Sequence, residues 1–286
     1  MKRSTQGVAA GIALALAAAA TATTLQVDKR LYQSAPAYAD KYIALRTPAY
    51  TAALTPAADG RVLSHLPYPT TVAAAIDALV GIEPLYRTKQ CDMLPVAATA
   101  AEKMMRAANA DLAGTAMLKA QSCFRSIPEQ VGIFCNTARN LPTAKCLDPV
   151  KRAQVSAPPG YSEHATGYTA DFVACGVGAG ARCGGLTQGF AASKPGQWML
   201  LHAREYGFEL SFPCDHQDDG RCVSKQGVSY EPWHWRWVGC SAVAPGAAQA
   251  RQIFADARRR FPANPGIDDA AVPAAGAATA PTCAKD

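Results

Sequence analysis

The sequence has no C-x-x-C pair, no dense run of basic residues, no internal repeat and, beyond residue 22, no long apolar stretch. Without C-x-x-C pairs, a structural zinc cluster is disfavoured. Without a basic run, nucleic acid is not an expected partner, although the mild net charge of +6 is compatible with work near an anionic polymer. Without a long apolar stretch, no stable membrane span is expected. The chain of 286 residues, 49% of them hydrophobic and 17% charged, can still bury a sizeable core.

Residues 1–22 have the three-part layout of a secretory signal peptide. Lys2 and Arg3 precede an apolar stretch from Val8 to Ala20, and the small-x-small triplet Ala20-Thr21-Ala22 follows. The alternative is an uncleaved anchor helix, but the apolar run is shorter than the roughly 20 residues that a membrane span needs. No cysteine follows directly, so a lipid anchor is not expected. We therefore expect a periplasmic or secreted protein.

Ten cysteines fit an exported protein, because disulfides persist in oxidising compartments. Their spacing does not determine the pairing. Short closures are nevertheless attractive, and each of three candidate pairs brackets a polar or glycine-rich loop: Cys175 with Cys183, Cys214 with Cys222, and Cys135 with Cys146.

The chain divides into four segments by composition. Residues 1–22 are the signal peptide, and residues 23–88 form an N-terminal extension of unknown role: a pro-segment, a spacer or a structural wrap. Within this extension, Val72–Val80 is helix-like. Residues 89–260 hold the candidate catalytic domain, and residues 261–286 read as a flexible Ala/Pro-rich tail.

The catalytic segment mixes helices and strands without a βαβ rhythm. Ala97–Ala110 has apolar residues at helical spacing, and Lys194–Tyr206 is a second helix with Ser193 as N-cap and Gly207 as the stop. Phe208–Phe212 alternates as a half-buried strand should. The other expected strands are Met117–Cys123, Ser229–Tyr230 and Trp235–Val238. This order predicts an α+β fold in which a small antiparallel sheet has flanking helices and is stabilised by disulfides.

Two short segments, residues 162–171 and 231–236, contain the residues with the strongest chemical signal. They carry two imidazoles and two carboxylates: His164, Asp171, Glu231 and His234. A catalytic zinc site needs three ligands with an open position for water, and a separate carboxylate that takes the water's proton. A lone histidine is as often a satisfied core or surface residue, so the second segment decides in favour of a metal site.

The two segments resemble the S-x-H-x-x-G-x-A-x-D and E-x-W-H-x-R signatures of the VanY-type D-alanyl-D-alanine carboxypeptidases, which are zinc peptidases. Ser122–Gln130 also resembles the S-G-Y-R-S-x-x-x-Q stretch of that family. The three motifs occur in the expected order over residues 91–240. The family shares its fold with VanX dipeptidases and some phage endolysins.

The resemblance implies a role for each matching residue. His164, Asp171 and His234 would be the ligands of one zinc ion per chain. Glu231 would be the general base that activates water and later protonates the leaving amine. Arg125 would lie near the substrate, where its guanidinium suits either a terminal carboxylate or a developing oxyanion; the alternative for Arg125 is a structural surface ion pair.

Other residues of the motifs are implied to act around the metal. Ser126, Gln130 and Trp233 are candidate substrate contacts, whereas Ser162 and Arg236 would orient the ligand segments. For Trp235 and Trp237 core packing is the favoured interpretation.

The chain departs from the family pattern in three places. Thr169 stands where the family has alanine, a small change that should be tolerated. Cys123 replaces glycine and Phe124 replaces tyrosine in the arginine motif, which removes a hydroxyl that could contact substrate. Residues 215–220 suggest a calcium loop but lack the twelve-residue pattern, so a disulfide-closed polar loop is the better interpretation.

These features predict an exported zinc metallopeptidase that hydrolyses peptidoglycan stem peptides. Release of terminal D-alanine, as by a D-alanyl-D-alanine carboxypeptidase, is the favoured outcome. One alternative is an endopeptidase that cuts within the stem peptide or cross-bridge, and another is a wall-binding module that has lost activity. We expect the protein to be a monomer.

Overall fold

The computed structural model describes residues 66, 68, 78–135, 154–157, 160–218, 221–223 and 226–267 of the chain. The predicted signal peptide, Cys146 of the predicted Cys135–Cys146 pair, and most of the predicted tail lie outside these residues. The division of the chain into four segments therefore stays a prediction.

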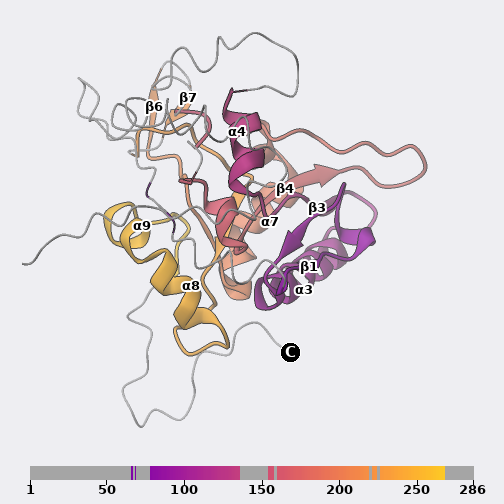
Figure 1. The fold of residues 1–286 in the computed structure, drawn as a ribbon. Coiled ribbons are helices and arrows are strands. Elements are labelled where there is room, and N and C mark those ends of the chain that lie inside the picture. The colour runs from indigo at the N-terminus through magenta and orange to yellow at the C-terminus, as the bar shows by residue number, and fades with distance from the viewer. Residues whose placement is uncertain are drawn as a thin grey trace, which may run out of the picture.

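A four-stranded antiparallel sheet forms the centre of the fold (Figure 1), and its strand order is β3-β4-β8-β5. Two shorter hairpins accompany it: β1 (Val80–Gly81) pairs with β2 (Asp92–Met93), and β6 (His216–Asp218) pairs with β7 (Arg221–Val223). The strands of the central sheet are β3 (Met117–Ser122), β4 (Thr169–Cys175), β8 (His234–Trp237) and β5 (Phe208–Leu210). The predicted α+β class is confirmed.

Helices flank the sheet. Figure 1 shows α3 close beside β3, with α8 and α9 on the opposite side of the molecule. The α-helices are α3 (Pro95–Asp111), α4 (Ile127–Cys135), α7 (Lys194–His202), α8 (Ala247–Ile253) and α9 (Ala255–Arg260). Short 3-10 turns are η2 (Pro84–Tyr86), η4 (Glu163–Thr166), η5 (Gln188–Ala192) and η6 (Ala203–Tyr206).

The two predicted helices are confirmed. Helix α3 contains the predicted range, and its apolar stripe is buried in the core: Ala97, Ala98, Ala101, Met104, Met105 and Ala108. At α7 the hydroxyl of Ser193 accepts a hydrogen bond from the backbone N–H of Gly196 at 3.1 Å, which is an N-cap. The helix tightens into η6 and ends at Gly207, whose φ of 85° lies in the left-handed region.

Two strand predictions were wrong in detail. The predicted strand Phe208–Phe212 is shorter, and it is not half-buried, because its residue Glu209 is only 1% exposed. Glu209 is buried because it lies between two arginines from β8 and α9. Among the described residues Ser229–Tyr230 forms no extended strand, although the Ser229 N–H donates a hydrogen bond to the carbonyl of Gln154.

The described end of the N-terminal extension belongs to the folded core. Leu66, Tyr68 and Ile82 are 8%, 7% and 1% exposed. Of the predicted helix Val72–Val80 only the last residues are described, and Val80 lies in β1. No helix among the described residues is long and apolar enough to cross a membrane.

Disulfides tie the loops to this framework. The predicted Cys175–Cys183 and Cys214–Cys222 bonds are present. A third bond, Cys91–Cys123, was not predicted. Cys240 is also disulfide-bonded, and none of the described cysteines is free.

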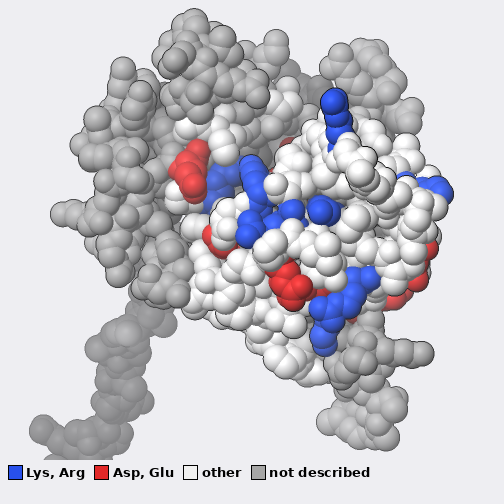
Figure 2. Space-filling model, turned by 90° about the vertical axis from the view of Figure 1, so that its right-hand side faces the viewer, with Lys and Arg blue, Asp and Glu red and all other residues white. Residues whose placement is uncertain are grey.

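On the face of the molecule shown in Figure 2, basic side chains are interspersed with acidic and uncharged surface.

Candidate metal centre and active-site pocket

Two of the three predicted metal ligands come from adjacent strands. Asp171 lies in β4, His234 is the first residue of β8, and the two are direct partners in the antiparallel register. Facing residues of such a pair have Cβ atoms roughly 4.5–5.5 Å apart, so the pairing itself brings the carboxylate and the imidazole together.

The third candidate ligand, His164, lies in the turn η4 that precedes β4. Gly167 ends this turn with φ of 74°, and the chain enters β4 two residues later. A Cβ atom at Gly167 would lie 3.1 Å from Cγ of Leu94 and 3.2 Å from Cδ2 of Leu79. Both the backbone conformation and the lack of space therefore require glycine at this bend.

The three candidate ligands form a compact and buried cluster. The Nε2 atom of His164 is 3.2 Å from Oδ1 of Asp171, and Nδ1 of His234 is 3.0 Å from the same oxygen. One ligand atom from each residue lies within 4.8 Å of the others. Two imidazole nitrogens and one carboxylate oxygen make a donor set that fits a catalytic zinc ion.

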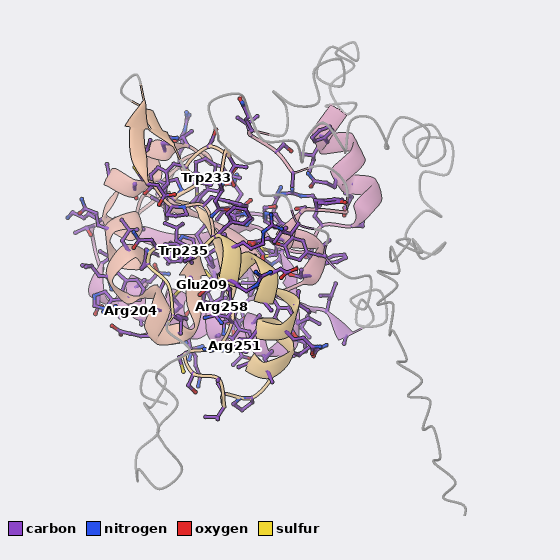
Figure 3. The ribbon with its side chains drawn as sticks, turned by 90° about the vertical axis from the view of Figure 1, so that its left-hand side faces the viewer. Arg204, Glu209, Trp233, Trp235, Arg251 and Arg258 are labelled. Atoms are coloured by element: carbon purple, nitrogen blue, oxygen red, sulfur yellow. A yellow bond between two sulfur atoms is a disulfide. The ribbon has the colours of Figure 1, made fainter. Side chains whose placement is uncertain are left out.

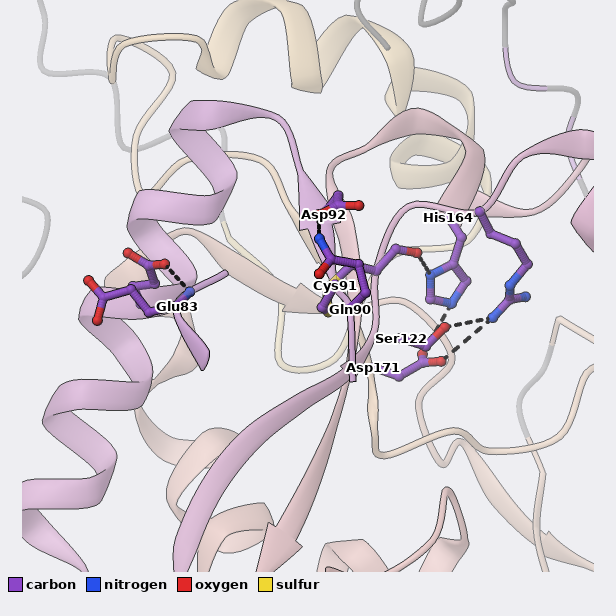
Figure 4. The surroundings of a disulfide bond; sticks show 10 residues. Glu83, Gln90, Cys91, Asp92, Ser122, His164 and Asp171 are labelled. Carbon is purple, nitrogen blue, oxygen red and sulfur yellow. Dashed lines mark hydrogen bonds and ion pairs between the residues drawn. A yellow bond between two sulfur atoms is a disulfide. The ribbon is translucent and has the colours of Figure 1, made fainter. Parts of the chain in front are cut away.

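The second ring nitrogen of each histidine has its own partner. The Nδ1 atom of His164 lies 2.7 Å from the carbonyl oxygen of Cys123, and Nε2 of His234 lies 3.0 Å from Oε2 of Glu163. If each of these nitrogens carries the proton and donates it, the opposite nitrogen of each ring presents its lone pair to the cluster. Figure 4 shows His164 and Asp171 beside the Cys91 disulfide.

The electrostatics of the cluster suit a divalent cation. Burial alone would raise the pKa of Asp171, but the neighbouring His164 and His234 outweigh it and hold the pKa well below its usual range. Glu163 behaves in the same way, since Arg236 and His234 outweigh burial and lower its pKa. Burial lowers the pKa of His164. The cluster therefore keeps two ionised carboxylates in a buried place.

Glu231 lies at the edge of this cluster, where a base is needed. Its Oε2 atom is 3.8 Å from Nδ1 of His234, and its side chain is 17% exposed and lines the pocket. A tight turn holds it there, because its backbone carbonyl accepts a hydrogen bond from the His234 N–H. Burial raises the pKa of Glu231 to about 7, a value that suits proton transfer near neutral pH.

Arg125 is also held at the pocket. Its guanidinium donates to Oε1 of Gln130 at 2.7 Å and to Oγ of Ser122 at 2.9 Å, and lies 4.0 Å from Oδ2 of Asp171. Its side chain is 16% exposed. Two neutral partners position Arg125, and its ion pair with Asp171 is long, so its guanidinium can still interact with a ligand in the pocket.

The structure shows local partners for the weaker candidate substrate contacts. Gln130 is 1% exposed and joins Arg125 to the carbonyl of Ala157, which favours positioning of the arginine over substrate contact. The Ser126 hydroxyl and N–H both donate to Glu129 at 2.8 Å, and this capping box starts α4. Trp233 lines the pocket. Their roles toward substrate stay predictions.

The sequence interpretation missed Glu163, although it directly precedes His164. Glu163 is 3% exposed and binds both His234 and Arg236. One signal could have revealed it: an arginine predicted to lie beside a metal ligand needs a buried carboxylate to balance its charge. The Cys91–Cys123 bond was missed as well, and it fixes the backbone whose carbonyl contacts His164.

A pocket of about 250 Å³ opens onto the cluster and brings together the predicted ligands, Glu231 and Arg125. Its apolar wall comes from Ile133, Val155, Leu186, Phe212 and Val228. Larger hollows of about 400 and 550 Å³ lie beside α3 and beside α9. Neither contains a cluster of metal-ligating side chains among its described residues, so the smaller pocket is the candidate active site.

Several known proteins are similar to this chain. It is 33% identical to YodJ of Bacillus subtilis (strain 168) over 127 residues, which span 44% of this chain and 40% of that protein. It is 37% identical to a D-alanyl-D-alanine carboxypeptidase of Enterococcus faecium over 87 residues, 30% of this chain and 23% of that enzyme. The chain thus spans less than half the length of either relative.

Solved structures with a similar arrangement include two peptidases. The LD-carboxypeptidase LdcB has a TM-score of 0.44 and 26% identity, over 62% of this chain and 77% of that one. A zinc complex of the D,D-pentapeptidase VanY has a TM-score of 0.43 and 21% identity, over 66% and 93% of the two chains. The family of VanY D-alanyl-D-alanine carboxypeptidases itself matches residues 90–240. Because this match takes in more than half of the 286 residues, the protein belongs to the VanY D-alanyl-D-alanine carboxypeptidase family.

Proposed function

We propose that this protein is an exported zinc carboxypeptidase that removes the terminal D-alanine from peptidoglycan stem peptides. The observation that carries the proposal is the buried cluster of His164, Asp171 and His234, with the carboxylate of Glu231 at its pocket side. A pure binding module would need no carboxylate of raised pKa at that place. The pattern of residues 1–22 and the disulfides support export.

When bound, zinc would polarise the scissile carbonyl and lower the pKa of a water molecule. Glu231 would accept a proton from water in the pocket and deliver it to the leaving amine. Its side chain suits both steps, because it is held next to His234 yet reaches the pocket. A pKa near 7 lets the same carboxyl group act as base and then as acid.

Arg125 supplies positive charge to the substrate. Held by Gln130 and Ser122, it keeps further N–H donors for the terminal carboxylate of a peptide or for the oxyanion formed during hydrolysis. Only the end of a peptide carries a free main-chain carboxylate. An Arg125 that binds this terminal carboxylate would therefore favour exopeptidase over endopeptidase action.

Digestion of purified muropeptides followed by mass spectrometry tests the proposal. The substrates are a stem pentapeptide that ends in D-alanyl-D-alanine, the tetrapeptide that lacks the last residue, and a cross-linked dimer. We expect the pentapeptide to lose one alanine. Cleavage inside the stem or cross-bridge would replace the proposal with an endopeptidase, and binding without cleavage would indicate an inactive wall-binding module.

The substitution Glu231→Ala separates metal binding from chemistry. The variant should retain about one zinc per chain, because Glu231 is not one of the three ligands, and should show no turnover. Glu205→Ala is the matched control, since the Glu205 side chain is 48% exposed and pairs with the exposed His202. Retained hydrolysis in Glu231→Ala would refute the assigned base.

A further inference from the structure

Tyr68 reaches the metal centre from a part of the chain that precedes the family match. It lies outside residues 90–240, within the predicted extension of unknown role. Its backbone N–H donates to the carbonyl of Gly160 at 3.3 Å, and its ring meets Phe254 edge to face at 5.5 Å. Packing on both sides leaves Tyr68 only 7% exposed, so the side chain has a fixed position.

The Tyr68 hydroxyl donates a hydrogen bond to Oε1 of Glu163 at 3.0 Å. The same oxygen accepts from Arg236 at 2.8 Å. The other oxygen, Oε2, accepts from the Ser211 hydroxyl at 2.6 Å and lies 3.0 Å from Nε2 of His234. A carboxylate has about four acceptor positions, and here each oxygen has two partners. Glu163 thus has one favoured orientation.

This orientation determines which nitrogen of His234 faces the metal centre. With its Nε2–H donated to Glu163, the ring turns Nδ1 toward the cluster, 3.0 Å from Oδ1 of Asp171, where a bound metal ion would take its lone pair. A carboxylate that accepts a hydrogen bond from a ligand histidine in this way fixes both the orientation of the ring and its tautomer. If Glu163 could rotate, the ring would lose the partner that distinguishes its two nitrogens.

We propose that Tyr68 is a positioning residue of the metal centre, which holds Glu163 in the orientation that presents Nδ1 of His234 to the metal. The inference rests on the proposed function only for the presence of zinc. It gives Tyr68 a role that the family match does not include, because the Tyr68 hydroxyl adds a hydrogen bond to the carboxylate beside a candidate ligand.

Zinc affinity of the full chain tests the proposal independently of hydrolysis. Tyr68→Phe removes the hydroxyl but keeps the ring that packs on Phe254. The matched control is Tyr168→Phe, because the Tyr168 hydroxyl also makes one side-chain hydrogen bond, to Gln249 at 3.2 Å, and its ring stacks on Trp237. Thermal unfolding of the metal-free proteins tests whether both variants fold.

Competition with a chromophoric chelator gives the zinc dissociation constants. We expect Tyr68→Phe to weaken zinc binding roughly tenfold, the low end of the range for partners of metal ligands, and Tyr168→Phe to leave it within about twofold of wild type. When cobalt replaces zinc, the visible absorption bands of Tyr68→Phe should differ from those of the cobalt-loaded wild type, whereas those of Tyr168→Phe should not. Equal zinc affinity and equal cobalt spectra in the two variants would overturn the proposal.

A double-mutant cycle tests whether Tyr68 acts through Glu163. Glu163→Gln should weaken zinc binding roughly 10- to 100-fold, and Tyr68→Phe should add nothing in that background. Additive effects would overturn the route through Glu163. A wild-type protein that binds zinc tightly but cleaves no muropeptide would refute the proposed function and leave this inference standing.

Discussion

The substitution Glu209→Gln removes one negative charge from the interior with almost no change of shape. Glu209 accepts hydrogen bonds from Nε of Arg236 at 2.8 Å and from Nε of Arg258 at 3.1 Å. It also accepts from the backbone N–H of Ile267 at 3.3 Å. Figure 3 shows Glu209 and Arg258 next to each other. The side chains of Glu209 and Arg236 are each 2% exposed.

The expected loss of stability follows from what each arginine retains. Breaking a buried ion pair by removing one partner costs about 3–5 kcal/mol, because the other charge stays buried without compensation. Arg236 keeps its contact with Glu163 at 2.8 Å, and the Arg258 side chain is 12% exposed and can be partly hydrated. We therefore expect the low end, about 3 kcal/mol. For a domain of this size that lowers the melting temperature by roughly 6–12 °C.

Urea unfolding of the metal-free, disulfide-intact protein measures this loss, because urea does not screen charges as guanidinium salts do. Glu205→Gln is the control, since the Glu205 side chain is 48% exposed and its pair with His202 is a surface pair. Surface pairs contribute about 0–1 kcal/mol. A loss in Glu209→Gln within about 1 kcal/mol of that control would refute the reasoning that this charge is needed inside.

Three further substitutions test other features. Arg125→Lys should lower kcat/KM for the pentapeptide roughly 100-fold while zinc content stays constant, because lysine cannot supply a planar fork of donors; unchanged kinetics would exclude a substrate contact. Burial and the Glu163 carboxylate raise the pKa of Tyr68 well above its usual value, so its contribution to stability is complete below about pH 10 and is lost as the pH rises further. The stability of wild type and Tyr68→Phe should therefore converge in alkaline urea titrations, and a constant difference would contradict this. Replacing both Cys91 and Cys123 by alanine should cost roughly 2–4 kcal/mol in unfolding experiments and weaken zinc binding, because the Cys123 carbonyl contacts a ligand histidine; undiminished zinc affinity would limit this bond to a role in stability.

The metal cluster could be predicted because its local geometry is encoded in short motifs. His164 and Asp171 are seven positions apart, and Gly167 between them permits the turn that brings both to one place. Glu231 precedes His234 by three residues, which a single turn bridges. The register that places Asp171 opposite His234 joins residues 63 positions apart, and no local pattern reveals it.

The buried charges could not be predicted in the same way. Charged residues are almost never fully buried unless they are paired, so the alternating segment that contains Glu209 predicts a half-buried strand. Its burial depends on Arg236 and Arg258, which come from distant elements. Glu163 was overlooked for the same reason, since its partner Arg236 is 73 residues away.

The unpredicted disulfide has a different explanation. Short closures were preferred, and they occur, but Cys91–Cys123 spans 32 residues. The entropy of closing a loop grows only slowly with its length, so a long closure is not much less favourable than a short one. Proximity in the fold decides the pairing. Cys91 directly precedes β2 and Cys123 directly follows β3, so the placement of these strands brings the two cysteines together.

Strand β8 contributes residues to both the candidate site and the hydrophobic core. His234 and Arg236 both reach Glu163, whereas the alternate residues Trp235 and Trp237 are 0% and 4% exposed within the hydrophobic core. A one-residue insertion or deletion in this strand would exchange the two sets, because side chains alternate along a strand. The strand should therefore tolerate insertions and deletions as poorly as the core does. A homologue that keeps the fold but has lost catalytic activity should therefore differ in β8 by substitutions, with the length of the strand unchanged.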